Sequence, residues 1–367
     1  MLKNTDGLKE ADLIRKAEDS LRKCLQPLPF VESISFDQGS TPSGEGPDFI
    51  ARLATFGKQK TIIGEVKNQG QPRFARAAAN QLLRYRQQFP DSYPVFVAPF
   101  ISPESANILQ AEGVGHLDMA GNCFLSFDKV FIRVQGNPNP FPQRRDLKSI
   151  FSPRSSRVLR VLLNAPPRPW KVEDLRQQAG VSIGLVAAVR KALLDREWAI
   201  EGSDGLTLSR PQALLEEWSS SYTYRRNEIS EYYSLQDLPA LERDLGSFCR
   251  DAGIAFALTM FSGASRVAPH TRFNRLFAYV DDRLEEIRNR FELRPVDSGS
   301  NVMLLKPYDT GVFYGIRSYQ GLPVVSPVQL CLDLKGYKGR GEEAAQFILG
   351  QMLEKTWSRD KTTSNEK

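Results

Sequence analysis

The stretch Thr61-Ile62-Ile63-Gly64-Glu65-Val66-Lys67 decides how the first part of this chain is interpreted. Its apolar run predicts a buried strand, but two charged residues interrupt it. Because side chains alternate across a strand, Glu65 and Lys67 point to one face and Val66 to the other. Charges on a core strand cost free energy unless they pair or bind a metal. The stretch therefore indicates a functional site.

A second carboxylate is predicted beside this strand. Pro47 opens another strand, Asp48–Ala54, and the loop 55–59 joins the two as a hairpin. Asp48 should then lie near Glu65, and two carboxylates with a lysine at a sheet edge can hold Mg²⁺ or Mn²⁺ against a phosphodiester. The alternative is a surface hairpin in which Glu65 and Lys67 form a solvated pair, although the apolar neighbours favour burial.

The helix expected over residues 73–88 adds a third motif, Gln81-Leu82-Leu83-Arg84-Tyr85. Gln81 and Tyr85 stand four residues apart and share one helical face. The order Pro47-Asp48, Glu65-Val66-Lys67, Gln-x-x-x-Tyr resembles the PD-(D/E)xK superfamily of metal-dependent nucleases, which has the restriction-endonuclease-like fold.

The resemblance implies roles for individual residues. Asp48, Glu65 and the backbone carbonyl of Val66 would bind the metal ion, and Lys67 would stabilise the attacking hydroxide or the phosphate. Gln81 and Tyr85 would orient the nucleic acid or support the site. No acidic residue occurs between Val66 and Pro90. This suits a helix that a phosphate backbone approaches, and the alternative is that its basic residues serve only to make the helix soluble. The helix residues predicted to contact DNA are Arg73, Arg76 and Arg84.

Two further features of this domain, residues 1–140, keep alternatives open. The amphipathic helix predicted over Leu8–Leu25 carries Glu10 and Glu18, either of which could add an acidic ligand, and a solvated face is the simpler interpretation. His116 and Asp118 share one strand face, where a catalytic role competes with a tight turn capped by Asp118. With the remaining strands, the domain is expected to be an α/β core of helix, three strands, helix and strand.

A basic, proline-rich linker is predicted over residues 141–154, and a winged helix-turn-helix over 155–211. The expected elements are helices at 155–163, 172–179 and 183–198, followed by a hairpin around Ser203-Asp204-Gly205. Ser182 would cap the third helix, which would enter the major groove of double-stranded DNA. The residues predicted to face DNA are Ser182, Gly184, Ala187, Arg190 and Lys191. Protein contacts are the alternative use of such a module.

A third, α+β domain is predicted over residues 212–357, followed by a disordered tail at 358–367. The turn expected at Phe261–Arg266 and the strand Phe277–Asp281 weakly resemble the nucleotidyltransferase fold. Transferase chemistry needs two carboxylates on one strand face, whereas Asp281 and Asp282 are adjacent and point apart. The sequence therefore predicts the fold without that activity.

The segment Ser326–Leu334 and the loop Gly339-Arg340-Gly341-Glu342-Glu343, with the winged helix before them, look like the AbiEi family of type IV antitoxins. The resemblance covers roughly residues 150–350. It implies a winged helix that binds its own promoter and a C-terminal domain that acts against a nucleotidyltransferase toxin. This chain differs from the short antitoxins because its winged helix is internal and a nuclease-like domain precedes it.

Composition limits the remaining classes. The chain has 367 residues, enough for two or three domains, and its 25% charged and 10% aromatic residues are ordinary for a soluble protein. A net charge of +6 suits a polyanionic partner. Two histidines argue against a histidine metal centre, and four scattered cysteines favour reduced thiols in a cytoplasmic protein. No apolar start or membrane-length run is present.

Two functions follow from the sequence. The first is a DNA-binding, AbiEi-like antitoxin and transcriptional regulator in toxin–antitoxin or phage defence, whose fused PD-(D/E)xK domain would cleave DNA with Mg²⁺. The second is primarily a Mg²⁺-dependent endonuclease that the winged helix brings to DNA, without an antitoxin role. Chelation separates them, because cutting needs the metal ion and repression does not.

Overall fold

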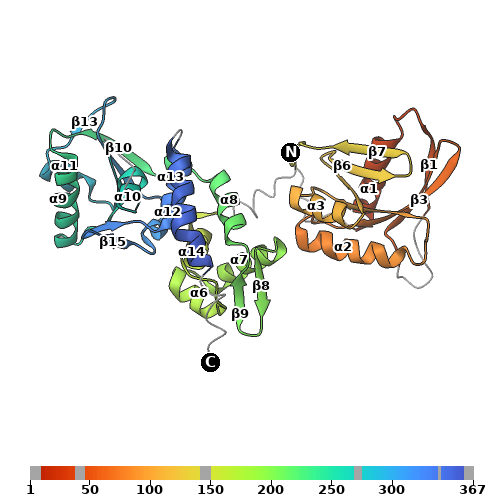
Figure 1. The fold of residues 1–367 in the computed structure, drawn as a ribbon, viewed down its shortest axis with the longest axis horizontal. Helices are drawn as coiled ribbons and strands as arrows, with labels where there is room; N and C mark the ends of the chain where they lie inside the picture. The colour runs from red at the N-terminus through yellow and green to blue at the C-terminus, as the bar shows by residue number, and fades with distance from the viewer. Residues whose placement is uncertain (1–9, 38–45, 141–149, 268–274, 338–339, 359–367) are drawn as a thin grey trace. The chain divides into compact units, whose positions relative to one another are not determined.

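The structure is a computed structural model that describes residues 10–37, 46–140, 150–267, 275–337 and 340–358. One compact unit comprises Met1–Arg145 with Asp195–Glu197, and a second comprises Asp146–Leu194 and Trp198–Lys367. Both are mixed α/β (Figure 1), in agreement with the coarse fold class expected from the sequence. Most of the predicted linker (141–149), part of the glycine loop before Asp48 (44–45) and nearly all of the tail (359–367) lie outside the described residues.

The first unit is a seven-stranded sheet with helices on both faces. Its elements are α1 (Glu10–Leu25), β1 (Val31–Asp37), β2 (Phe49–Thr55), β3 (Lys58–Val66), α2 (Pro72–Tyr85), β4 (Tyr93–Ala98), α3 (Pro103–Ala111), β5 (Gly115–Asp118), β6 (Cys123–Phe127) and β7 (Val130–Val134). The strands lie in sequence order, with β3, β4 and β5 parallel and the other neighbours antiparallel.

Strand β3 separates two hydrophobic cores. Ile62 and Val66 pack into the core under α1, whereas Ile63 packs into the core under α2 and α3. Since side chains alternate, Glu65 and Lys67 belong to the α2 side. The sequence signal and the packing therefore agree on which face carries the charges.

In the second unit, residues 153–208 have the elements of a winged helix. These are α5 (Pro153–Asn164), α6 (Val172–Ala179), α7 (Ile183–Asp195), β8 (Ala199–Gly202) and β9 (Gly205–Leu208). Gly180 ends α6 in the left-handed conformation with φ 62°, as expected for a glycine after a helix. Trp170 adds a short third strand, because it exchanges both backbone hydrogen bonds with Leu206 at 2.8 and 3.0 Å.

The rest of the second unit is a mixed seven-stranded sheet in the order β13-β10-β14-β12-β11-β16-β15 with surrounding helices. Its elements are α8 (Pro211–Ser221), η2 (Tyr224–Arg226), β10 (Glu228–Tyr233), α9 (Leu238–Asp251), β11 (Phe256–Leu258), α10 (Met260–Val267), β12 (Leu276–Val280), α11 (Leu284–Arg290), β13 (Arg294–Pro295), β14 (Val302–Lys306), η3 (Thr310–Phe313), β15 (Arg317–Tyr319), β16 (Leu322–Val324), α12 (Pro327–Lys335), α13 (Arg340–Ile348), η4 (Leu349–Leu353) and α14 (Glu354–Trp357). The turn predicted at Phe261–Arg266 is wrong, since these residues lie in α10. There Gly263 lets the helix pack closely on Leu330, and a Cβ on it would lie 2.7 Å from that side chain.

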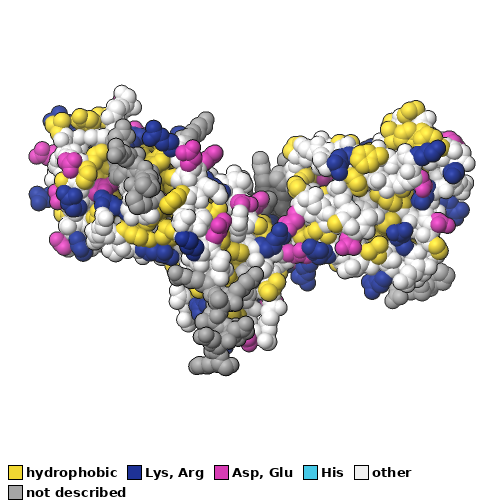
Figure 2. All heavy atoms as spheres, in the orientation of Figure 1, with side chains coloured by type: hydrophobic (Ala, Val, Ile, Leu, Met, Phe, Trp, Pro, Cys, Tyr) yellow, Lys and Arg dark blue, Asp and Glu magenta, His cyan; other side chains and the backbone are white. Residues whose placement is uncertain are grey.

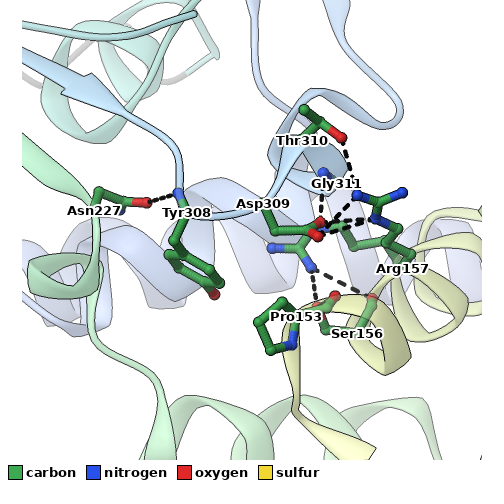
Figure 3. A network of polar contacts seen from close by, with 9 residues as sticks. Pro153, Ser156, Arg157, Asn227, Tyr308, Asp309, Thr310 and Gly311 are labelled. Carbon is green, nitrogen blue, oxygen red and sulfur yellow. Dashed lines mark hydrogen bonds and ion pairs between the residues drawn. The ribbon is translucent and has the colours of Figure 1, made fainter. Parts of the chain in front are cut away.

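The winged-helix residues and the α+β residues, expected as separate domains, share one hydrophobic core. Polar contacts reinforce this junction. The guanidinium of Arg157 on α5 donates to both carboxylate oxygens of Asp309 at 2.9 Å and to Thr310 (Figure 3). Within the α+β part, the side-chain oxygen of Asn227 accepts from the backbone of Tyr308, next to Asp309. Trp357 donates from its indole nitrogen to Leu163 O at 2.9 Å. The winged helix is therefore part of the body formed with the α+β sheet.

Asp333 on α12 is the polar centre of this body. Its Oδ1 accepts from Tyr222 at 2.6 Å, Tyr279 at 3.0 Å and Gln329 at 2.9 Å, and its Oδ2 accepts from Thr259 at 2.6 Å. Gln329 in turn accepts at 2.6 Å from Arg160 of α5, which is 1% exposed. Hence α12 and the first helix of the winged helix meet through a continuous hydrogen-bonded chain.

We expect Asp333→Ala to lower the free energy of unfolding by about 3 kcal/mol or more, because four buried donors lose their acceptor. Asp333→Asn keeps an acceptor oxygen and should cost much less. Burial raises the pKa of Asp333, against the opposing effect of its hydrogen bonds. Protonation of Asp333 therefore stabilises the folded state at low pH, and this contribution is lost as pH rises through the folded pKa. The Asn variant should lack that dependence. Urea unfolding across pH measures both effects, and equal costs for the two variants would contradict the proposed role.

Candidate functional sites

The predicted carboxylates and lysine of the first unit come together at the end of β3. Glu65 is 1% exposed, and its Oε1 accepts a hydrogen bond from Lys67 Nζ. Asp48 precedes β2 directly, and its Oδ2 accepts from Val66 N at 2.6 Å. The Asp48 amide donates to Gly64 O at 2.9 Å, which fixes Asp48 opposite Glu65 in the antiparallel pair. The structure therefore gathers Asp48, Glu65 and Lys67 as the sequence predicted.

The electrostatics of the site centre on Lys67. Partial burial lowers the pKa of its ammonium, but the hydrogen bond and charge of Glu65, the charge of Asp48 and a smaller contribution from Tyr85 outweigh burial and raise it. Lys67 is thus protonated at neutral pH and remains about a third exposed. A fixed cation beside two carboxylates suits the stabilisation of negative charge on a phosphate.

Helix α2 brings the Gln81–Tyr85 pair to the same face. Gln81 Nε2 donates to Tyr85 OH at 2.6 Å, so the two side chains are locked together across one helical turn. The predicted DNA-contacting arginines, Arg73, Arg76 and Arg84, are exposed on the outer side of α2. Figure 2 shows Lys and Arg side chains over this helix.

The donor set fits a partial Mg²⁺ shell. Two carboxylates and a nearby backbone carbonyl, that of Val66, are hard oxygen ligands, and Mg²⁺ commonly binds one or two carboxylates and keeps several waters. Among the described residues, no cluster of three or more His, Cys, Asp or Glu residues is arranged to hold a metal ion. Any ion here would therefore depend on water and substrate oxygens for the rest of its shell.

Other titratable groups of the first unit have structural surroundings. The Asp118 carboxylate accepts from Ala120 N at 3.0 Å and from Asn122 N and Nδ2 at 2.9 Å, which is the capped turn expected from sequence. Glu18 lies on α1, which packs on the face opposite Glu65. Cys24 and Cys123 meet with their sulfurs 3.4 Å apart, and all four cysteines are free thiols.

Gly64 allows the close approach that positions Asp48 and Glu65. A Cβ on Gly64 would overlap the ring of Phe49, the residue after Asp48. We therefore expect Gly64→Ala to lower the free energy of unfolding by about 1–3 kcal/mol through overpacking. In a Phe49→Ala background the same change should cost less, because the obstructing ring is gone. Denaturant unfolding of the wild type, the two single variants and the double variant gives the four free energies of this double-mutant cycle. If the costs of the two substitutions simply add, Phe49 is not the obstacle.

In the second unit, α7 presents a small-residue surface. Ser182 Oγ accepts from Leu185 N at 3.3 Å and caps the helix, as predicted. Of the residues predicted to face DNA, Ser182, Gly184, Ala187 and Lys191 are exposed. Val186, Val189 and Leu193 on the opposite side are buried. Such a surface allows close approach to base edges and contact with thymine methyl groups.

Arg190 differs from its neighbours. It is only half-exposed, and its guanidinium holds Glu201 of the wing, with Nε donating to Oε1 at 2.8 Å. In this structure it connects α7 to β8. Beside the start of α7 lies an open groove of about 800 Å³, lined by Ser152, Pro153, Arg154, Arg157, Gly180, Val181, Ser182 and Leu185. Arg154 gives this groove positive charge next to the helix start, whereas Arg157 is paired with Asp309.

Sequence reasoning missed two exposed apolar side chains of this module. Ile183 at the start of α7 is 55% exposed, and Ile200 on the wing is 61% exposed. An isoleucine at a helix start looks like a core residue in sequence, so only the structure reveals it. In the α+β domain, Asp281 accepts from Ala255 N and Arg283 N, whereas Asp282 pairs with Lys306 at 2.6 Å, so the two carboxylates point apart.

Comparison with known proteins identifies one match. Residues 207–354 match a family model described as transcriptional regulator, AbiEi antitoxin, type IV TA system. The match begins within β9 and ends at the start of α14, so it covers the α+β domain and supports a regulator and antitoxin role for that part. No curated protein and no solved structure matches the chain. Within the described residues, no helix is long and apolar enough to span a bilayer.

Proposed function

We propose that this chain is a double-stranded-DNA-binding regulator of the AbiEi antitoxin type, in which α7 reads the major groove and the α+β domain binds a nucleotidyltransferase toxin. The single observation that carries the proposal is the family match over residues 207–354. The winged-helix elements directly before this segment and the exposed small residues of α7 support DNA reading.

The shared core supports linking the two roles. Because α5 is joined to α12 through Arg160, Gln329 and Asp333, the DNA-reading helix and the antitoxin domain belong to one body. A protein bound to the α+β domain would therefore act on the module that contacts the operator. This is the arrangement expected of a regulator whose DNA affinity depends on its partner.

Lys191→Ala should weaken binding to the chain's own upstream DNA several-fold and reduce the slope of log affinity against log salt by about 1, because one phosphate contact is lost. Gel shifts at several salt concentrations measure both quantities. Arg250→Ala is the matched control, since this exposed arginine lies on α9 of the α+β domain. If Lys191→Ala leaves the affinity and the salt slope at wild-type values, α7 is not the reading helix.

A second activity is favoured by the site at the end of β3. We propose that the first unit cleaves phosphodiesters, with Asp48, Glu65 and the Val66 carbonyl holding Mg²⁺, which supplies Lewis acidity when bound. Lys67 stabilises negative charge on the phosphate, and the Gln81–Tyr85 pair supports the lysine face of the site. The supporting observation is the convergence of two carboxylates on one protonated lysine at a sheet edge.

Incubation of supercoiled plasmid with the pure protein and Mg²⁺ or Mn²⁺ tests this activity. We expect nicking that EDTA abolishes and that falls at least a hundredfold in Glu65→Gln and Lys67→Met, since both remove charge from the reacting centre. Asp91→Asn, an exposed acid elsewhere in the unit, should behave like the wild type. Nicking that persists in Asp48→Ala and Lys67→Ala would identify a contaminating nuclease and remove the proposal.

A further inference from the structure

Helices α2 and α3 cover only part of the sheet face that carries Glu65. Cross-strand pairs run in one row from Glu65 to Phe96, His116, Phe124 and finally Arg133 on β7. Helix α2 packs on β3 and β4, and α3 packs on β5. The β6–β7 end of the row therefore lies outside the helical cover, about 20 Å from Glu65 at normal strand spacing.

Aromatic rings and a guanidinium form the surface at this end. Phe131 is 66% exposed, although it is a large apolar residue, and its ring meets Phe124 edge-on at 5.8 Å. The Arg133 guanidinium lies 5.2 Å from the Phe124 ring centre and 5.8 Å from that of Phe131. Figure 2 shows hydrophobic and basic side chains together over β6 and β7. We call Phe124, Phe131 and Arg133 the β6–β7 surface.

This surface is held in place from beneath. His116 stacks on the inner side of Phe124, with ring centres 6.0 Å apart. Gln110 of α3 makes hydrogen bonds to His116 Nε2 at 3.3 Å and to Arg133 Nη2 at 3.2 Å. Burial, together with the charge of Arg133, lowers the pKa of His116 to about 4, so the ring is neutral at physiological pH. The supporting residues thus orient the arginine without neutralising it.

The charge around the surface favours an anionic ligand. In the part of the chain that the structure describes, no carboxylate forms an ion pair with Arg133, and the exposed Lys129 stands at the β6–β7 turn. Asp128, the neighbouring acid, pairs with Lys60 at 3.5 Å. An unpaired cation against exposed aromatic rings is the combination that stacks bases while attracting phosphate.

We propose that the β6–β7 surface binds unpaired bases of single-stranded nucleic acid, with Phe131 and the Arg133 guanidinium as stacking partners. Paired bases are excluded, because a duplex offers its π-faces only at its ends. This site is separate from α7 and goes beyond the operator binding and the phosphodiester cleavage proposed above. It requires neither a metal ion nor an active carboxylate site.

The test is fluorescence anisotropy of the full chain with labelled 15-nucleotide oligo-dT and a labelled 15-bp duplex, in EDTA so that no cutting occurs. Phe131→Ala and Arg133→Ala should each weaken oligo-dT binding about tenfold and change duplex affinity less than twofold. Arg133→Lys keeps the charge but not the planar group, so it should recover only part of the lost affinity.

Phe56→Ala is the matched control. Phe56 is 54% exposed at the opposite end of the sheet and is stacked on Phe30, so its loss removes an exposed ring without touching the β6–β7 surface. Lys191→Ala separates this site from the operator reader, because it should weaken duplex binding alone. Wild-type oligo-dT affinity in both Phe131→Ala and Arg133→Ala overturns the proposal. A change of oligomeric state in these variants with unchanged oligo-dT binding also overturns it and identifies an interface between copies.

Discussion

The second unit depends on keeping one buried carboxylate satisfied. Asp333 is fully buried, and removing its charge from water costs several kcal/mol, in rough terms, unless donors replace the lost solvent. Four side chains supply those donors, from α8–η2, β12, the β11–α10 junction and α12 itself. The buried cation Arg160 is connected to it through Gln329. Because these partners come from elements far apart in the chain, the carboxylate can be buried only when α8, the sheet and α12 are assembled together, and Gln329 extends the network to Arg160 of the winged helix. This explains the segment Ser326–Leu334, on which the family likeness rests. Its Ser326 caps α12, and its Gln329 connects Asp333 to Arg160 of the winged helix, so the segment has a structural role.

The buried carboxylate of the first unit is stabilised in the opposite way. Asp333 is enclosed by neutral donors, whereas Glu65 is held by the cationic Lys67, which remains a third exposed. Asp48 beside it is also only half-buried. An enclosed carboxylate has no room for a ligand, but a carboxylate–lysine pair that opens to solvent leaves charge available to one. The contrast supports assigning a scaffold role to Asp333 and a chemical role to Glu65, even though both are acids with almost no exposed area.

Sequence was informative where the signal was local and failed where partners were distant. The apolar run before Glu65, the Gln–Tyr spacing and the Gly180–Ser182 turn each determine their own element, so those elements appear as expected. Strand β10, with Glu228, Ser230 and Glu231 among its residues, has no continuous apolar run, and β15 and β16 are three residues long with Pro323 inside. Their strand state comes from neighbours in the sheet, which no local pattern contains. Nothing in the local sequence marks Arg160 as buried, yet it is 1% exposed, because its partner Gln329 lies 169 positions away.

The weak charge of α7 has consequences for the DNA reading proposed above. Of the α7 residues predicted to face DNA, Arg190 and Lys191 are cationic, and Arg190 is paired with Glu201. Phosphate contacts supply much of the affinity of most DNA-binding modules, so a helix with so few cations must rely on fit to the groove. Ser182, Gly184 and Ala187 permit that fit, and Ile183 and Ile200 offer apolar surface suited to thymine methyl groups. Arg154 and Arg157 line the groove beside the start of α7, and the guanidinium of Arg157 is paired with Asp309. Arg157 therefore links the lining of this groove to the α+β domain, and in the proposed function its release from Asp309 would add positive charge beside α7.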